Sequence, residues 1–110
     1  MKDAQTQFIQ GTLELLILRT LIYGAAHGHA IAKHIQSSSE TLRIETGSLY
    51  PALHRLEAQG LVKAAWRLSD KGKRAKYYQL TPAGKKHLTA ENSRWEQFVL
   101  AMRRVLLPSE

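Results

Sequence analysis

The residues of this sequence that are best suited to a chemical task form a run of cations between positions 71 and 76. Four of the six residues KGKRAK carry a positive charge and none is acidic: Lys71, Lys73, Arg74 and Lys76. Ammonium and guanidinium groups at this density are suited to binding the phosphates of a nucleic acid. A solvated turn that is charged only for solubility has the same composition, so the run needs support from its surroundings.

The distribution of charge along the chain gives that support. The 110 residues carry a net charge of +7, yet residues 1–45 and residues 91–110 are each electrically balanced. Residues 46–90 hold nine lysines and arginines against two acidic residues, so the whole surplus lies in this segment. A surplus confined to one segment is typical of a phosphate-binding surface.

The sequence offers few residues suited to metal binding, cofactor binding or catalysis. The chain has no cysteine, which excludes disulfides, thiolate metal sites and thiol nucleophiles. His27 and His29 are two residues apart and do not share a helix face, and no histidine has a carboxylate at a familiar ligand spacing. No nucleophile motif or glycine-rich cofactor loop is present. We therefore expect no enzyme activity, no cofactor and no metal ion.

Targeting and membrane signals are missing from the sequence as well. No apolar run approaches the roughly 20 residues that a membrane span needs. The first residues, MKDAQTQF, lack the charged and then apolar layout of a signal peptide. We expect a soluble, cytoplasmic protein without membrane contact.

Two helices are predicted before the basic segment. The nearly all-apolar pattern of TLELLILRTLIYG predicts a largely buried helix with Thr12 as its N-cap and Gly24 as its stop. Residues 27–39 form a second, shorter helix that buries Ile31 and Ile35, four residues apart.

The stretch ETGSLYPALHRLEAQGL predicts a third helix with one buried face. Its apolar stripe recurs at helical spacing and consists of Leu49, Leu53 and Leu56, with Ala52 beside them. Gly60 fits the left-handed position that ends a helix. The opposite face then presents Tyr50, His54 and Arg55 to solvent.

The front of this helix is suited to an anion. Gly47 and Ser48 add little bulk next to the first backbone N–H groups, which lack helical partners and attract a phosphate. Pro51 loses no hydrogen bond if the helix starts near Ser48, so that it falls in the first turn. An ordinary capped core helix explains Thr46 or Ser48 as an N-cap, but not an exposed polar face followed by a basic segment.

A β-hairpin and a last helix complete the predicted elements. LVKAAWRLS and AKYYQLT read as strands on either side of DKGKR, with Gly72 in the turn. Thr81 is the expected N-cap of the last helix and Pro82 its first residue. Three helices followed by a basic hairpin give the order of a winged helix-turn-helix, so we expect a mainly α fold with a small β-hairpin.

The last helix carries an apolar seam. Leu88, Trp95, Phe98, Met102 and Val105 follow a coiled-coil-like spacing, and Val99 and Leu106 extend the apolar surface. Folding back on its own core is the alternative, but this surface is larger than one helix needs for that. We therefore assign residues 1–81 to a DNA-binding domain and residues 82–110 to a C-terminal dimerisation helix, within one structural unit.

GSLYPALHRLEAQGLV followed by KYYQLTPAG resembles the PadR family of bacterial transcriptional regulators, in particular its short members with a single C-terminal helix. QGTLELLILRTL and HGHAIAKHI are similar to the first two helices of that family. The resemblance implies a homodimeric repressor that binds an inverted-repeat operator of double-stranded DNA. It also implies that Tyr50 contacts a phosphate and that Lys73 and Arg74 lie at the tip of the wing. The predicted DNA-binding set is Thr46, Gly47, Ser48, Tyr50, Pro51, His54, Arg55, Lys71, Lys73, Arg74 and Lys76.

Two further expectations come from the resemblance. Some members of the family bind flat aromatic compounds near tryptophans of the last helix, which makes Trp95 a candidate for binding a planar aromatic inducer; its alternative role is an anchor of the dimer interface. His29 stands where the family usually has a tyrosine, which affects the packing of the second helix. A different class of function remains open: a winged-helix module whose basic face binds an acidic protein partner.

Overall fold

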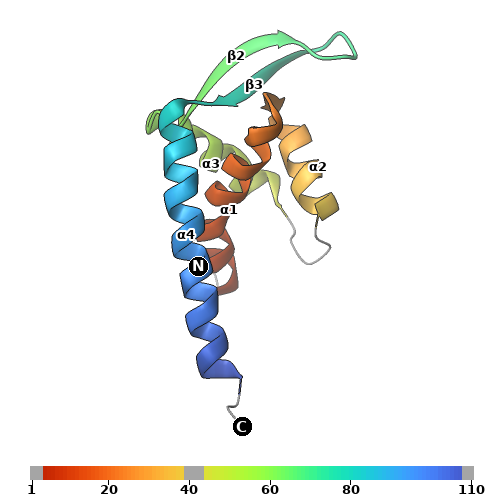
Figure 1. The fold of residues 1–110 in the computed structure, drawn as a ribbon. Coiled ribbons are helices and arrows are strands. Elements are labelled where there is room, and N and C mark those ends of the chain that lie inside the picture. The colour runs from red at the N-terminus through yellow and green to blue at the C-terminus, as the bar shows by residue number, and fades with distance from the viewer. Residues whose placement is uncertain (1–3, 39–43, 108–110) are drawn as a thin grey trace.

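The computed structural model describes residues 4–38 and 44–107, with side chains described from residue 12 onward. The helices form one layer, and a small sheet lies across one end of it (Figure 1). The predicted class, mainly α with a small β element, is confirmed. The elements are α1 (Ala4–Thr20), the 3-10 turn η1 (Leu21–Tyr23), β1 (Ala26–His27), α2 (Gly28–Ser38), α3 (Thr46–Ala58), β2 (Val62–Leu68), β3 (Arg74–Leu80) and α4 (Pro82–Leu106).

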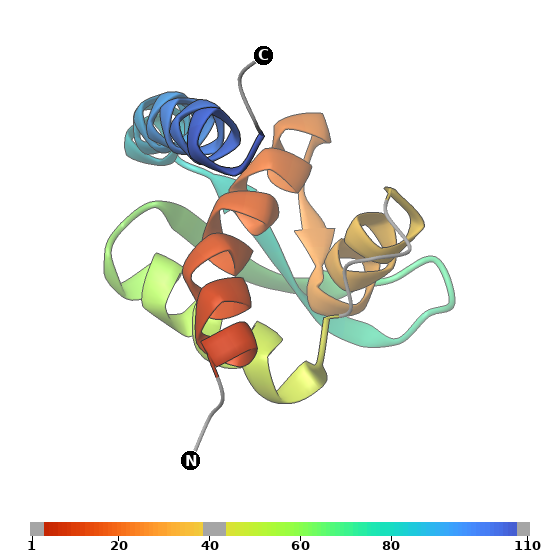
Figure 2. The same cartoon turned by 90° about the horizontal axis from the view of Figure 1, so that it is seen from below.

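Helix α1 runs through the middle of the molecule, with α2, α3 and α4 around it (Figure 2). Its predicted start is wrong, because the helix begins at Ala4 and Thr12 lies in its interior. Gly24 ends the segment as predicted, with a φ of 132°, but only after the turn η1. The side chains that α1 and α2 contribute to the core include Leu13, Ile17, Leu18, Ile31 and Ile35.

The apolar stripe of α3 is buried, as its spacing predicts. Leu49, Ala52, Leu53 and Leu56 are each at most 2% exposed. The helix ends in a Schellman motif: the N–H of Gly60 donates to the carbonyl of Glu57, and that of Leu61 to the carbonyl of Leu56, both at 3.0 Å. Gly60 has a φ of 74°, which confirms the predicted left-handed end.

The start of α3 differs from the prediction. The helix begins at Thr46, with Glu45 as its N-cap residue, and not near Ser48. Pro51 is therefore the sixth residue of the helix and lies outside the first turn. Because proline has no N–H, the carbonyl of Gly47 loses the partner that position 51 would ordinarily supply. The condition under which Pro51 would cost no hydrogen bond, a helix start near Ser48, is therefore not met.

The predicted hairpin is present as part of a three-stranded antiparallel sheet of order β1-β3-β2. Strands β2 and β3 pair in register from Val62 opposite Leu80 to Leu68 opposite Arg74. Gly72 lies in the connecting loop with a φ of 76°, as predicted. The third strand was not predicted: β1 has only two residues, which pair with Tyr77 and Tyr78 of β3.

Helix α4 starts at a close junction with the end of α3. The hydroxyl of Thr81 accepts the N–H of Gly84 at 3.0 Å, which confirms the predicted N-cap, and donates to the carbonyl of Gly60 at 2.7 Å. The N–H of Thr81 donates to the carbonyl of Leu61 at 3.2 Å. Gly84 is buried against that same carbonyl, so closely that a Cβ at position 84 would overlap its oxygen.

This junction leads to a prediction for Gly84→Ala. The added methyl group meets backbone, which cannot rotate away, so we expect the free energy of unfolding to fall by about 1–3 kcal/mol. Urea denaturation followed by circular dichroism measures the change. Gly47→Ala is the matched control, because it also adds a methyl group near the start of a helix but meets nothing within 4 Å. Equal stability of the two variants would contradict the prediction.

Candidate nucleic-acid interface

A concave surface that encloses a volume of about 410 Å³ lies where the hairpin meets the starts of α2 and α3. Among the described residues that line it, none is acidic. It brings together three of the predicted wing cations and the tyrosine of α3, which the sequence could only associate by their order along the chain. The lining residues that matter most are Gly28, Tyr50, Trp66, Lys73, Arg74 and Lys76.

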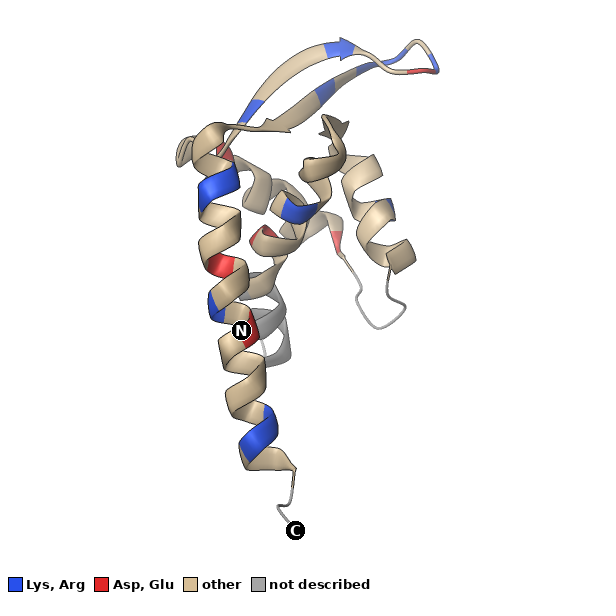
Figure 3. Ribbon diagram, viewed as in Figure 1, with Lys and Arg blue, Asp and Glu red and all other residues tan. Residues whose placement is uncertain are grey.

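The cations of the hairpin are positioned by strand alternation and by aromatic neighbours. Trp66 and Lys76 are opposite each other in the ladder, so they share one face of the sheet. The guanidinium of Arg74 lies over the Trp66 ring, 5.2 Å from its centroid. This stacking orients a positive charge beside an aromatic surface that is 58% exposed. The positive residues extend along the hairpin toward its tip (Figure 3).

The loop at the tip is closed by its own hydrogen bonds. The N–H of Ser69 donates to the carbonyl of Lys73 at 2.7 Å, and the N–H of Lys73 donates to the Ser69 hydroxyl at 3.2 Å. Lys71 and Lys73 are both exposed in this loop. Two predicted cations therefore project from a turn whose backbone is held in place.

Tyr50 is placed by a close contact with α2. Its ring lies so near Gly28 that a Cβ there would be 2.8 Å from Tyr50 Cε1 and 2.9 Å from the hydroxyl oxygen. Tyr50 nevertheless remains 41% exposed, with its ring at the concave surface. Gly28 was not among the predicted site residues, and the signal available for it was a glycine at the second position of the helix predicted over residues 27–39.

Tyr78 and Lys76 form the deeper part of the surface. Lys76 Nζ lies 3.1 Å from Glu57 Oε1 and 5.6 Å from the centroid of the Tyr78 ring. Burial raises the pKa of the Tyr78 hydroxyl; the charge of Lys76 opposes this shift and that of Glu57 adds to it. Tyr78 is therefore a neutral hydroxyl at physiological pH, and Lys76 already has an ionic partner on α3.

The other predicted residues of α3 do not line the concave surface. Thr46 and Gly47 are exposed at the start of the helix, and Ser48 is half-buried. His54 is exposed farther along. Arg55 is half-exposed and its Nε lies 2.6 Å from Glu14 Oε1 on α1, so its charge is paired within the fold.

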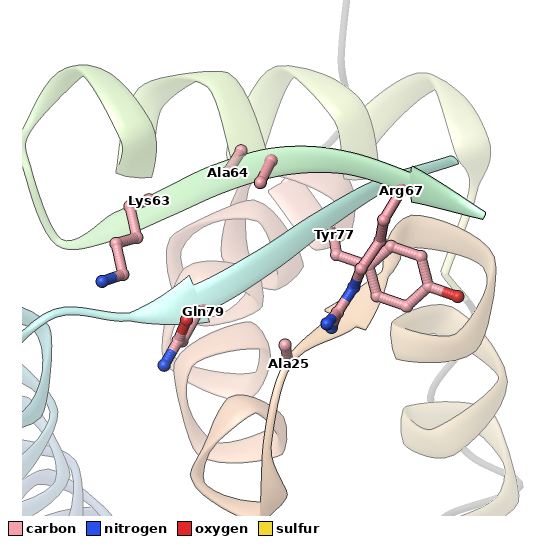
Figure 4. Close-up of a pocket in the computed structure, with 7 residues that line it drawn as sticks. Ala25, Lys63, Ala64, Arg67, Tyr77 and Gln79 are labelled. Atoms are coloured by element: carbon pink, nitrogen blue, oxygen red, sulfur yellow. The ribbon is translucent and has the colours of Figure 1, made fainter. Parts of the chain in front are cut away.

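The opposite face of the sheet carries a second group of cations (Figure 4). Lys63 and Arg67 of β2 point to this side, because they alternate with Trp66 along the strand. Arg67 lies over the ring of Tyr77, 4.1 Å from its centroid, and Gln79 is opposite Lys63. This face is turned away from α3 and from the concave surface.

The C-terminal half of α4 exposes a long apolar face. Phe98, Met102, Val105 and Leu106 are 42–83% exposed, and Val99 is half-buried. Leu88, which the sequence analysis grouped with them, is only 6% exposed and packs in the core of its own chain. Trp95 is half-buried, with its ring 5.8 Å from that of Phe98 beside a groove between α1 and α4. Its role in binding an aromatic ligand stays a prediction.

No metal site is evident among the described residues, where no three histidine, aspartate or glutamate side chains gather closely enough to hold an ion. The rings of His27 and His29 are stacked, 6.4 Å apart. Within the same part of the chain, no helix has both the length and the apolarity to span a membrane.

Comparison with known proteins shows similarity in sequence to transcriptional regulators. Residues 17–90 match the model of the transcriptional regulator PadR-like family. The transcriptional regulator Rv3488 of Mycobacterium tuberculosis (strain ATCC 25618 / H37Rv) is 34% identical over 91 residues, which are 83% of this chain and 82% of that protein.

Solved structures agree in fold. A transcriptional regulator from Clostridium thermocellum superimposes with a TM-score of 0.82 at 31% identity, covering 91% of this chain and 98% of that one. A PadR-like transcriptional regulator from Bacillus cereus strain ATCC 14579 gives a TM-score of 0.80 at 24% identity, over 94% and 99% of the two chains. These likenesses establish the winged-helix arrangement.

The contact between Gly28 and Tyr50 predicts a non-additive pair of substitutions. Gly28→Ala alone forces the Tyr50 ring outward, and we expect a loss of about 1 kcal/mol in the free energy of unfolding. In a Tyr50→Ala background the clash is gone, so the same change becomes neutral or slightly stabilising, because alanine suits a helix better than glycine. Urea denaturation of the four proteins measures the coupling. Equal effects of Gly28→Ala in both backgrounds would show that the two residues do not touch.

Proposed function

The chain belongs to the transcriptional regulator PadR-like family, and from this premise we propose that it represses transcription as a homodimer on an inverted-repeat DNA operator. DNA-binding regulation is the activity of the family; the repressor role, the operator and the dimer are our proposal. The observation that carries it is the concave surface where Tyr50 of α3 meets Lys73 and Arg74 of the hairpin, with no acid among its described lining residues.

In this proposal α3 enters the major groove and the hairpin clamps the sugar-phosphate backbone. In the first turn of α3 the N–H of Ser48 donates to the carbonyl of Glu45 at 3.0 Å. The N–H groups of Thr46 and Gly47 come before any helical acceptor, and this end of the helix favours a phosphate. Gly47 leaves that approach open, since a Cβ at this position would meet nothing within 4 Å. Lys73 supplies sequence-independent affinity, and Arg74, fixed on Trp66, is suited to a narrow minor groove.

The dimer is proposed from the exposed face of α4. Val105 and Leu106 are 83% and 69% exposed, which is costly for a helix that stays in water. Pairing this face with its copy in a second chain buries both, as in a two-fold symmetric interface. Two copies of α3 then face DNA together, and half-sites about one helical turn, ~34 Å, apart would suit them.

Substituting the wing cations tests DNA binding. We expect Lys73→Ala and Arg74→Ala each to weaken binding to mixed-sequence duplex DNA, and to reduce the log–log salt slope by roughly 0.9, the contribution of one phosphate contact. Fluorescence anisotropy across a salt series measures both quantities.

Arg67→Ala is the matched control for Arg74→Ala. Both arginines lie on the hairpin and stack on an aromatic ring, but Arg67 is on the opposite face of the sheet. Its replacement should leave the slope nearly unchanged. Equal losses from the two arginines, or no DNA complex at low salt, would count against the clamp, and the second result would favour an acidic protein partner instead.

Val105→Asp tests the dimer. Because the side chain is almost fully exposed in one protomer, a carboxylate there should leave the fold intact and disrupt association by burying an unpaired charge. Sedimentation velocity at micromolar concentration should show a dimer for the wild type and a monomer for the variant. Ile22→Asp, at an exposed position of η1, is the control and should remain dimeric. A monomeric wild type would rule the dimer out.

A further inference from the structure

His27 closes the first turn of α2. Its Nδ1 accepts the backbone N–H of Ala30 at 3.1 Å, three residues ahead, which is the hydrogen bond of a helix N-cap. The same residue belongs to β1, where it pairs with Tyr77, and its ring meets the edge of the Tyr77 ring at 5.3 Å. One imidazole thus ties the start of α2 to the sheet.

The turn that His27 closes is the turn on which Tyr50 rests. Gly28 directly follows His27, and its Cα side lies against the Tyr50 ring with no room for a methyl group. A change in the path of the first turn of α2 therefore moves the tyrosine of α3. Gly28 and Tyr50 both line the concave surface that faces DNA in the proposed function.

The cap needs a neutral imidazole. Nδ1 can accept a hydrogen bond only when it carries no proton, whereas both ring nitrogens are donors in the protonated form. Protonation would also add a positive charge at the positive end of the helix dipole. The groups that face the His27 ring are Tyr77 of β3, 5.3 Å away, with Arg67 of β2 stacked on that tyrosine ring at 4.1 Å, and His29 of α2 at 6.4 Å. The concave surface beside it is lined by Tyr50 of α3 and by Lys73, Arg74, Lys76 and Tyr78 of the hairpin. None of these described residues is acidic, and Glu57, the carboxylate next to them, is paired with Lys76.

We propose that His27 is a positioning residue for the DNA-binding surface, and that protonation of its ring, by removing the cap of α2, weakens binding. This inference rests on the proposed function. The predicted effect of acid on DNA affinity has a distinctive direction. Protonation of an exposed histidine such as His29 or His54 adds a positive charge, which attracts phosphate and strengthens binding. A surface whose histidines act only through their charge therefore binds DNA more tightly in acid. Protonation of His27 has the opposite effect, because it removes the cap of α2.

The experiment compares the wild type with His27→Asn and His27→Ala. Asparagine keeps an N-cap acceptor that does not titrate, and alanine has no acceptor. The probe is a fluorescein-labelled mixed-sequence DNA duplex of roughly 20 base pairs, about two helical turns. Anisotropy titrations at low salt are run near pH 7.5 and near pH 5.5, values that bracket the usual range of histidine protonation. Circular dichroism at each pH confirms that each protein is folded.

Near neutral pH, we expect His27→Asn to bind like the wild type and His27→Ala to bind several-fold more weakly. On acidification, the Kd of the wild type should rise about fivefold relative to that of His27→Asn, the factor that corresponds to one lost cap. The ratio between His27→Ala and His27→Asn should not change with pH. If His27→Ala does not fold, the comparison of the wild type with His27→Asn carries the test by itself.

Two results would overturn the inference, and each is distinct from a failure of the proposed function. The first is a wild type and a His27→Asn variant with the same change of Kd between the two pH values. The second is a His27→Ala variant that binds as tightly as His27→Asn near neutral pH. A wild type that binds no duplex near neutral pH would refute the proposed function itself, and with it a positioning role toward DNA.

Discussion

The contact between Gly84 and the carbonyl of Leu61 joins the three elements that carry the proposed surfaces: α3, the hairpin and α4. Leu61 takes part in the end of α3 through its N–H, which donates to the carbonyl of Leu56. Its carbonyl accepts the N–H of Thr81 and lies against the Cα of Gly84. The end of the proposed recognition helix, the base of the hairpin and the start of α4 therefore meet at one residue, Leu61. Backbone contacts of this kind leave little freedom for one element to rotate against another.

This constraint connects the two proposed surfaces of the protein. Helix α4 extends away from the junction and carries the exposed apolar face, while the hairpin leaves from the same point toward its basic tip (Figure 1). The angle between α3 and α4 is set within one chain, so a dimer formed through α4 would present its two α3 helices at a fixed separation. An operator with matching half-site spacing is then selected by geometry before any base is contacted.

Local signals explain which parts of the fold could be predicted. The leucine stripe of α3, the caps at Gly60 and Thr81 and the turn at Gly72 each depend on a few neighbouring residues, and all are confirmed. Strand β1 could not be predicted, because two residues have no periodicity of their own and are held by pairing with β3. Leu88 fits both a core position and the seam, since both require an apolar residue at helical spacing, and only packing decides between them.

The candidate site was harder to predict, because its geometry comes from contacts between distant segments. The wing cations were identified from composition alone, but Gly28 meets Tyr50 only after α2 and α3 have packed together. The position of Pro51 within α3 was also beyond what the sequence could predict, because it depends on the residue at which the helix starts. A helix start two residues earlier, at Thr46, moved it out of the first turn, and the fold tolerates the lost hydrogen bond.

The ion pairs refine what the localised charge of the sequence means. Arg55 is paired with Glu14 and Lys76 with Glu57, so two cations of the basic segment do not face solvent as free charges. Such partly exposed pairs contribute only about 0–1 kcal/mol to stability, and a phosphate that approaches Arg55 competes with its carboxylate at little cost. The pairs therefore orient these side chains in the free protein without committing their charge. In the proposed function, the attraction for DNA in the free protein is therefore assigned mainly to the wing tip, where Lys71, Lys73 and Arg74 are all exposed.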